Sequence, residues 1–453
     1  MPKQPNIVLF NCDDLGFGDL GCYGSTLNDT PVIDRMAAEG LRLTSFYVAS
    51  PVCSPSRGSL MTGCYPKRVG FDQFEGKAVL FPGQGVGLNP EEVTIAKLLQ
   101  TAGYHTLHIG KWHCGDQPQF LPTRHGFDHY YGLPYSNDMG MQAGRVNRYP
   151  PLPLLADEEV LQEQPDQASL AERYMEQAIR FIRKSGESPF FLYFAPLQVH
   201  LPLYAPSRFV QQSRNGDYGA AVACIDWCIE VLLSELKRLS LAEDTLVVFM
   251  SDNGSRGDHG GSNAPLRGAK TTTWEGGMRV PCIAYWPGRI QPGNVSDEIV
   301  AALDWYPTFA RLAGIELPDR TIDGLDITDF LLQVPSVPSP RQVMFYYHKD
   351  AIEAVRDGKW KLHVGKIGEP FEALFDLEQD TGETDNVWEL HPNVVARLKQ
   401  LIAKCGEELG DRAAGLPGTN IRKIGQVERP STLTHVTDDH PYMCALYDKP
   451  EFG

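Results

Sequence analysis

Strand-like runs alternate with segments of helical periodicity through the first three quarters of the chain. Residues 190–195 and 246–250 are apolar throughout, and residues 7–11 and 104–109 are further strand-like runs. A strand that is buried on both faces has no polar side, so these runs predict a buried, mostly parallel sheet. Their alternation with helices predicts that helices cover both faces of this sheet.

Capping residues mark where helices begin. The pairs Thr30-Pro31 and Asn89-Pro90 each predict a first turn, because a polar side chain caps the free amides and proline suits the first helical position. Gly40 and Gly103 are placed to end these two helices. Residues 218–239 predict a longer helix.

The composition changes at residues 334–340, Val-Pro-Ser-Val-Pro-Ser-Pro, which we interpret as a linker. Beyond it, Asp357-Gly358 between two strand-like segments predicts a β-hairpin, and residues 393–409 predict a helix. We therefore expect an α/β domain over residues 1–335, with a large mostly parallel mixed sheet between helices. A smaller α+β domain is expected over residues 341–453, with an antiparallel sheet, a helix and a tail.

Length and charge restrict the class of protein. The chain has 453 residues, too many for one ordinary core, and a formal net charge of −16. Nucleic acids and anionic membranes bind basic surfaces, so we expect neither as a partner. A local group of Lys and Arg side chains still suits a small anionic substrate, because the effect of a charge is local at physiological salt. The oligomeric state is not predicted.

The sequence was compared with the patterns of a membrane-spanning helix and of a signal peptide. No apolar run reaches the roughly 18 residues of a membrane-spanning helix. The first residues, MPKQPNIVLF, lack the apolar stretch of a signal peptide. We expect a cytoplasmic protein, or a periplasmic or secreted one if an export signal has been removed.

Polar residues suited to catalysis follow the predicted strands. In open α/β sheets, ligands bind beyond the carboxyl ends of the strands, so four separate segments are expected to bring these side chains to one edge. They are Asp13 and Asp14, Lys111 and His113, His200, and Asp252 and Asn253.

Four of these residues suggest a metal site. Asp13, Asp14, Asp252 and Asn253 supply only hard oxygen ligands, which suit Ca²⁺ or Mg²⁺ rather than zinc. The alternative is that each pair merely ends a strand and begins a turn. That alternative is favoured for either pair alone, whereas two such pairs at strand ends favour the metal.

The segment Cys53–Gly63 places a cysteine at the predicted start of a helix. Ser54 suits the cap and Pro55 suits the first turn, so Cys53 lies at amides that favour an anion. Arg57 lies one turn later and can reach the same point. The pattern alone leaves open a structural cysteine, a metal ligand and a thiol nucleophile.

The same segment carries a resemblance to a known family. With C-x-P-S-R at residues 53–57, followed by Gly-Ser-Leu-Met-Thr-Gly, the chain resembles the formylglycine-dependent sulfatases of the alkaline-phosphatase-like superfamily. Its opening and Pro134-Tyr135-Ser136 are closest to the branch of arylsulfatase A and N-acetylgalactosamine-6-sulfatase. The resemblance implies an alkaline-phosphatase-like fold and hydrolysis of sulfate esters. Further matching blocks lie at residues 6–24, 110–113, 252–254, 265–270, 274–281 and 373–386.

The resemblance implies a nucleophile made after translation. A maturation enzyme would oxidise Cys53 to formylglycine, whose hydrate has two hydroxyls: one attacks sulfur and displaces the alcohol, and the other then loses its proton and expels sulfate. A plain Cys, Ser or Thr has no second group for this release. The implied cofactor is Ca²⁺, with Mg²⁺ as the alternative, bound by Asp13, Asp14, Cys53, Asp252 and Asn253.

The resemblance assigns binding roles to four further side chains. Arg57 would fix the diol, and Lys111 and Lys270 would neutralise the sulfate oxygens in the transition state. Ser136 would hydrogen-bond to sulfate. Taken singly, such lysines are usually surface charges.

Two histidines would move protons. His113 would accept the proton of the second hydroxyl, and His200, together with Lys270, would protonate and bind the leaving group. After Lys270 the family often has glycine, where this chain has Thr271. If that position needs a positive φ, the β-branched side chain is strained there.

The expected substrate is a small sulfated molecule, a sulfated carbohydrate with aryl sulfates as surrogates. Contacts beyond the sulfate are expected from residues 135–153, with Tyr135, Arg145 and Tyr149 as candidates. Two alternatives stay open. One is a formylglycine-dependent phosphonate monoester or phosphate diester hydrolase of the same superfamily, and the other is a non-catalytic sulfatase-like protein that binds sulfated glycans.

Overall fold

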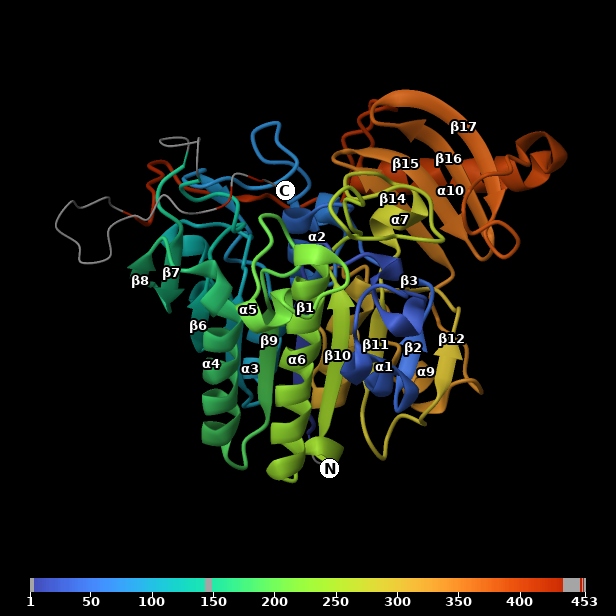
Figure 1. Cartoon of the computed structure of the whole chain (residues 1–453). Coiled ribbons are helices and arrows are strands. Elements are labelled where there is room, and N and C mark those ends of the chain that lie inside the picture. The colour runs from blue at the N-terminus through green and yellow to red at the C-terminus, as the bar shows by residue number, and fades with distance from the viewer. Residues whose placement is uncertain (1–3, 143–148, 435–448, 450, 452–453) are drawn as a thin grey trace.

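A mixed 10-stranded sheet forms the centre of the larger part of the protein in the computed structural model, which describes residues 4–142, 149–434, 449 and 451 (Figure 1). The consecutive neighbours β10, β1, β9, β5 and β6 are mutually parallel. Antiparallel strands flank them, with β11 beside β10 and the β7–β8 pair beside β6. The predicted mostly parallel mixed sheet is confirmed. In spatial order its strands are β12 (Asn294–Ser296), β2 (Leu41–Leu43), β11 (Cys282–Tyr285), β10 (Thr245–Ser251), β1 (Asn6–Cys12), β9 (Phe190–Ala195), β5 (His105–Gly110), β6 (His129–Gly132), β7 (Pro153–Ala156) and β8 (Glu159–Glu163).

Helices cover both faces of this sheet, as the alternation of elements predicted. Along β1, Ile7 and Leu9 pack into one core with α2, α3 and α8, and Val8 and Phe10 pack into the other with α1, α4 and α6. Each large side chain buried in this way contributes about 1.5–3 kcal/mol. Figure 1 shows α4 and α6 in front of the sheet. The helices are α1 (Pro31–Ala38), α2 (Cys53–Thr62), α3 (Ile95–Gln100), α4 (Leu170–Ser185), α5 (Ser207–Val210), α6 (Gly216–Arg238), α7 (Glu275–Met278), α8 (Trp305–Ala313), α9 (Thr328–Gln333) and α10 (Pro392–Leu409).

Two predicted helix starts had different outcomes. α1 begins at Pro31 after Thr30, as predicted, but the Thr30 side chain makes no cap hydrogen bond, and the Val32 and Ile33 amides donate to Asp226 instead. The predicted start at Asn89-Pro90 is wrong, because α3 begins at Ile95. Thr94 is its N-cap and accepts a hydrogen bond from the Lys97 amide. Asn89 instead forms a local turn in which its side-chain oxygen accepts from the Glu91 amide at 3.0 Å.

The C-terminal part is an antiparallel sheet covered by α10. Its strands follow one another in order, and the predicted hairpin between β15 and β16 is present, with Gly358-Lys359 as its turn directly after Asp357. The chain then returns to the larger part, where β18 (Gly425–Gln426) pairs with β4 (Val86–Gly87). The domain limits at residues 335 and 341 stay a prediction. The remaining strands are β14 (Val343–His348), β15 (Ala351–Asp357), β16 (Trp360–Lys366) and β17 (Glu369–Asp376), with the small pair β13 (Val300–Ala301) and β3 (Phe46–Tyr47).

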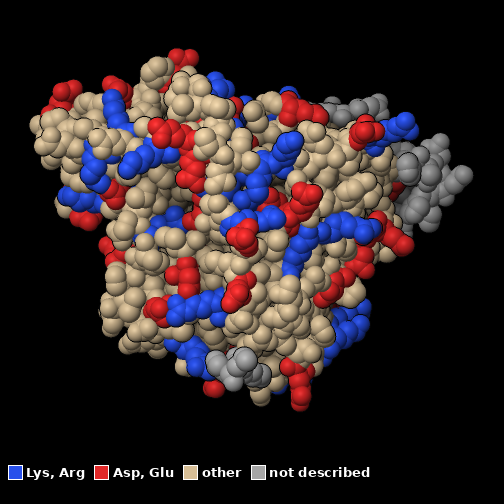
Figure 2. Space-filling model, turned by 180° about the vertical axis from the view of Figure 1, so that it is seen from behind, with Lys and Arg blue, Asp and Glu red and all other residues tan. Residues whose placement is uncertain are grey.

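The surface mixes charges of both signs. On the face shown in Figure 2, Lys and Arg side chains are interspersed with Asp and Glu side chains. Among the described helices, none combines the length and apolar character that crossing a membrane requires. The expectations about nucleic acid, membranes and cellular compartment stay predictions.

Candidate active site

The loops that follow β1, β5, β9 and β10 meet at the carboxyl edge of the large sheet. Because Cys12 of β1 pairs with Ser251 of β10, the residues that follow these two strands lie side by side. The structure thereby brings together every residue that the sequence placed at this edge, along with the four that the resemblance assigned to the site. Each is at most 8% exposed: Asp13, Asp14, Cys53, Arg57, Lys111, His113, Ser136, His200, Asp252, Asn253 and Lys270.

Two buried ion pairs neutralise the aspartate pair. Lys111 Nζ lies 2.8 Å from Asp13 Oδ2, and Lys270 Nζ lies 2.8 Å from Asp14 Oδ2. Burial alone would raise the pKa of Asp13, but nearby cations, Lys111 above all, hold it well below its usual range. Lys270 lowers the pKa of Asp14 against the same effect of burial. Both carboxylates are therefore ionised at neutral pH.

Arg57 connects the cysteine helix α2 to the third carboxylate. Its Nε and Nη2 lie 2.8 and 2.7 Å from Asp252 Oδ2, and its Nη1 donates to the Lys111 carbonyl at 2.9 Å. Burial, against the opposing effect of Arg57 and together with the nearby Asp13 carboxylate, raises the pKa of Asp252 to about 6. This crowding of carboxylates would be relieved by an additional cation.

Cys53 lies at the bottom of the site as a protonated thiol. Its Sγ lies 3.6 Å from Asp13 Oδ1, and the residue is 2% exposed. Burial raises its pKa to about 12, and Lys111 and Lys270 offset this only in part. Because the thiolate is the nucleophilic form of cysteine, the unmodified side chain is a poor nucleophile at neutral pH.

The start of the cysteine helix differs from the prediction. α2 begins at Cys53 itself, and its N-cap is Val52, which makes no side-chain cap. Ser54 is not the cap. Its Oγ instead accepts a hydrogen bond from the Leu80 amide at 3.1 Å, which ties the helix to the loop before β4. Pro55 lies in the first turn, as predicted.

His113 is held in one tautomer. Its Nε2 lies 3.0 Å from the Leu80 carbonyl oxygen, which can only accept, so Nε2 carries the hydrogen and Nδ1 carries a lone pair. Within the described part of the chain, Nδ1 has no hydrogen-bond partner. Burial, and after it Lys111, lowers the pKa of His113 well below its usual value. The ring is therefore neutral.

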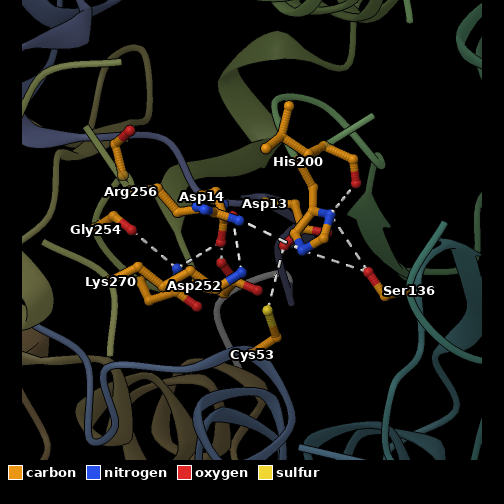
Figure 3. A network of polar contacts seen from close by, with 12 residues as sticks. Asp13, Asp14, Cys53, Ser136, His200, Asp252, Gly254, Arg256 and Lys270 are labelled. Carbon is orange, nitrogen blue, oxygen red and sulfur yellow. Dashed lines mark hydrogen bonds and ion pairs between the residues drawn. The ribbon is translucent and has the colours of Figure 1, made fainter. Parts of the chain in front are cut away.

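His200 is oriented by its other nitrogen. Nδ1 lies 2.5 Å from the Leu201 carbonyl oxygen and 3.1 Å from Asn137 Oδ1, so Nδ1 is the nitrogen that donates there. Nε2 then faces the site, 3.8 Å from Asp14 Oδ2 and 3.5 Å from Ser136 Oγ (Figure 3). Burial lowers the pKa of His200. Asn137 was not predicted, and its only signal in the sequence was its position next to Ser136.

Backbone contacts fix the segment that carries Lys270. The Lys270 amide donates to the Ser255 carbonyl at 3.0 Å, and the Thr271 amide donates to the Pro51 carbonyl at 2.9 Å. Thr271 has a φ of +74°, so the residue after the lysine does need the left-handed conformation. A β-branched residue held in that region stores about 1–3 kcal/mol of strain.

A buried charge network joins the residues after Lys270 to the C-terminal sheet. Lys361 Nζ lies 2.8 Å from Glu275 Oε1 and 3.0 Å from Glu383 Oε1, and all three side chains are 0% exposed. The hydroxyl of Thr273 donates to Glu353 Oε2 at 2.6 Å. This network was not predictable from the sequence, because single charged residues far apart in the chain are usually surface positions.

The carboxylate cluster has the chemistry of a cation site. One ligand atom each from Asp13, Asp14, Cys53 and His200 lies within 4.8 Å of the others. Asn253 Nδ2 donates to Asp14 Oδ1 at 2.7 Å, while Asn253 Oδ1 is buried without a hydrogen-bond partner among the described residues. A buried oxygen that is unpaired beside ionised carboxylates fits a hard cation such as Ca²⁺.

Asp252 has a different environment from the other predicted metal ligands. Its Oδ1 accepts from the Asp14 amide at 3.2 Å, and its Oδ2 is held by Arg57. Figure 3 shows Asp252 beside Asp14, with Cys53 below Asp13. Asp252 and Cys53 stay predicted ligands.

A pocket of about 420 Å³ opens over these groups. Tyr135, a candidate for contact with the substrate, is buried and is not among the described residues that line the pocket. Tyr149 stacks on Phe81 with ring centroids 6.2 Å apart, and Arg145 lies outside the described residues. The lining comprises Val52, Cys53, Ala78, Val79, His113, Ser136, Asp138, Met139, His200, Arg256, Asp258, Lys270 and Thr271.

The chain is similar to proteins of known activity over most of its length. The profile of the family described as Sulfatase matches residues 5–315, and that of N-sulphoglucosamine sulphohydrolase, C-terminal, matches residues 269–408. Arylsulfatase A of Homo sapiens is 39% identical, over 88% of this chain and 87% of that protein. N-acetylgalactosamine-6-sulfatase of Rattus norvegicus is 42% identical, over 80% of this chain and 72% of that protein. A crystal structure of Ps i-CgsB in complex with k-i-k-neocarrahexaose superposes with a TM-score of 0.79 at 31% identity, covering 88% and 92% of the two chains.

Proposed function

The chain belongs to the sulfatase family and hydrolyses sulfate esters, and on this premise we propose that its nucleophile is a formylglycine made from Cys53 and its substrate a sulfated carbohydrate. The observation that carries the proposal is the state of Cys53. It lies at the bottom of the pocket beside Asp13 and two lysines, yet burial raises the pKa of its thiol to about 12. A side chain at the reacting position that is inert as cysteine supports the role of a precursor.

Formylglycine supplies, as its hydrate, one hydroxyl to attack sulfur and a second whose deprotonation releases sulfate. His113 suits the proton acceptor for this release. Its Nδ1 carries the lone pair, has no hydrogen-bond partner among the described residues, and belongs to a ring that lines the pocket with Cys53. The neutral ring is the form that a base needs.

Lys111, Lys270 and Ser136 suit the binding of the sulfate group. The Lys111 ammonium group pairs with Asp13 and the Lys270 ammonium group pairs with Asp14. Lys111 Nζ also lies 3.3 Å from Ser136 Oγ. Donors that are fixed in place before the reaction stabilise developing charge without reorganising. Arg57 would hold the side chain at position 53, since it lies on the same helix and is itself held by Asp252.

His200 suits the protonation of the leaving alcohol in its imidazolium form, because Nδ1 donates to the Leu201 carbonyl and the transferred proton must be carried by Nε2. With Nδ1 directed to the Leu201 carbonyl, its Nε2 is the nitrogen that faces the site. Lys270 pairs with Asp14, the aspartate that His200 Nε2 also faces, and it would help to neutralise the departing oxygen. General acid catalysis of this kind contributes typically 10²- to 10⁴-fold.

The proposed cofactor is Ca²⁺, with Mg²⁺ as the alternative. Asp13, Asp14, Asp252 and Asn253, together with the modified side chain at position 53, would hold the ion. Such an ion would polarise the sulfate oxygens and favour ionisation of the hydrate. Carboxylate and amide oxygens match the preference of Ca²⁺ for hard ligands.

A carbohydrate sulfate is the proposed substrate class. One relative is named for N-acetylgalactosamine 6-sulfate, and a structural neighbour at 31% identity holds a neocarrahexaose. The pocket of about 420 Å³ lies in the usual range for small ligands and has polar groups at its closed end. The maturation enzyme that would oxidise Cys53 is the proposed transient partner.

Mass spectrometry of the peptide that contains Cys53 tests the proposal directly. Protein made together with a maturation enzyme should carry an aldehyde in place of the thiol and should release sulfate from an aryl sulfate. Cys53→Ala should keep the fold and lose turnover, whereas Cys22→Ala, which removes a half-buried thiol outside the pocket, should keep turnover. Full activity of Cys53→Ala, or a clear kinetic preference for a phosphate diester over the aryl sulfate, would contradict the proposal.

A further inference from the structure

Arg256 is a cationic residue of the pocket and is separate from Lys111 and Lys270, which are proposed to bind the sulfate group. It lies three residues after Asn253, on the segment that follows β10, and it lines the same pocket as Cys53 and Lys270. In Figure 3 its side chain extends toward Asp14 and Lys270. We propose that Arg256 forms a subsite for a second anionic group of the substrate, a carboxylate or a further sulfate. This inference rests on the proposed function.

The two lysines of the site are each paired with a buried carboxylate. Lys111 and Lys270 each lie 2.8 Å from an aspartate, and both side chains are at most 7% exposed. Arg256 instead pairs with Asp258 at 2.9 Å, and these side chains are 30% and 59% exposed. Because an exposed pair is worth little, a substrate anion can replace Asp258 at small cost. The guanidinium fork also binds carboxylate and sulfate oxygens in a bidentate way.

The segment around Arg256 does not depend on this ion pair for its shape. Asn263 Oδ1 accepts from the Ser255 amide at 2.9 Å, and Asn263 Nδ2 donates to the Ser255 carbonyl at 2.8 Å. Asp19 Oδ1 accepts from the Ser262 amide at 2.7 Å. These buried contacts hold both ends of the segment. The segment therefore keeps its shape without the Arg256–Asp258 pair, so Arg256 can be substituted without unfolding it.

Outside the sulfate end, the other described residues that line the pocket leave Arg256 as the group that would bind a second anion. Asp138 and Asp258 also line it, and without Arg256 they would repel a second anion. Val52, Val79 and Met139 supply apolar surface that suits the face of a sugar ring. Among the described residues, the lining thus combines an apolar wall with Arg256, and we infer a substrate in which a second negative charge lies close to the scissile sulfate ester.

Paired substrates test the subsite. Wild type and Arg256→Gln are compared on three pairs: N-acetylgalactosamine 6-sulfate with its 4,6-disulfate, and an unsubstituted aryl sulfate with analogues that carry a ring carboxylate or a second sulfate. Loss of a charge-assisted hydrogen bond should lower kcat/KM for the dianionic member about 10- to 100-fold more than for its partner, mainly through KM. The carboxylate and sulfate arms separate the two kinds of anion.

Two control variants make the comparison specific. Asp258→Asn keeps the arginine and removes its competitor, so it should strengthen the preference for the dianionic substrates. Arg214→Gln removes an arginine from an exposed pair with Asp29 away from the pocket, and it should keep the wild-type ratio. Equal losses on both members of every pair, or no loss on either, would overturn the subsite. Wild-type enzyme that carries the aldehyde yet hydrolyses none of the sulfates would overturn the proposed function instead.

Discussion

Replacement of Lys361 by methionine should strongly destabilise the junction between the large sheet and the C-terminal sheet. The ammonium group lies 2.8 and 3.0 Å from the carboxylates of Glu275 and Glu383, without exposure to solvent. Methionine fills most of the same space but leaves two buried carboxylates with less compensation. Breaking a buried ion pair on one side costs about 3–5 kcal/mol, a large part of the typical stability of a protein.

Urea and thermal unfolding provide the measurement, and the chain contains a matched control. Lys359 lies in the turn directly before the same strand and pairs with Asp376 at 2.6 Å, but its side chain is 37% exposed. Lys359→Met should therefore change the free energy of unfolding far less than Lys361→Met does. Adding Glu383→Gln to Lys361→Met should recover part of the loss, because it removes one of the uncompensated charges.

Activity gives a second readout of the same substitution. The Lys361 ammonium also donates to the Thr273 carbonyl at 3.0 Å, three residues after Lys270. We expect Lys361→Met to lower kcat/KM for sulfate ester hydrolysis even well below its unfolding temperature, because the segment that carries Lys270 loses an anchor. If Lys361→Met and Lys359→Met shift the unfolding midpoints by the same small amount, the buried network does not hold the C-terminal sheet.

Three further predictions follow from single groups. Asp252→Ala should weaken calcium binding in isothermal titration together with activity; undiminished binding would remove Asp252 from the ligand set. Thr271→Gly should relieve the φ of +74° and, after the entropic cost of glycine, raise the free energy of unfolding by up to about 1 kcal/mol, whereas Thr271→Ala should not. Burial, and after it Lys361, lowers the pKa of Lys366 to about 6, so unfolding takes up a proton between about pH 6 and pH 10. The stability of wild type relative to Lys366→Met should accordingly rise with pH from 6 to 9, and a flat difference in urea unfolding would contradict the lowered pKa.

The sequence predicted the strands better than the helix starts. The runs at 190–195 and 246–250 are found as β9 and β10, because a strand buried on both faces must be apolar at every position. Capping signals are weaker evidence, since several polar residues compete for the same role. Asn89 matched the pattern of a helix start, but the Thr94 hydroxyl made the actual cap.

The candidate site could be assembled from the sequence only in outline. The order of strands and polar residues predicted that Asp13 and Asp252 would lie at one edge, and the parallel pairing of β1 with β10 brings them together. The charge state of each group was not predictable. The pKa of Cys53 near 12 follows from complete burial, and the tautomer of His113 follows from a carbonyl of Leu80, 33 residues away in the chain.

By itself, the sequence determined the kind of chemistry: a C-x-P-S-R segment, oxygen ligands after two strands, and lysines and histidines after others. The tertiary structure decided which of these groups are ionised, which nitrogen of each histidine faces the pocket, and which distant residues hold Lys270 in place. It also brought Arg256 into the pocket and buried Lys361 between two carboxylates. The reason is physical: residue types and local spacing are properties of the chain, whereas burial, electrostatic interaction and hydrogen-bond direction arise between segments that only folding brings together.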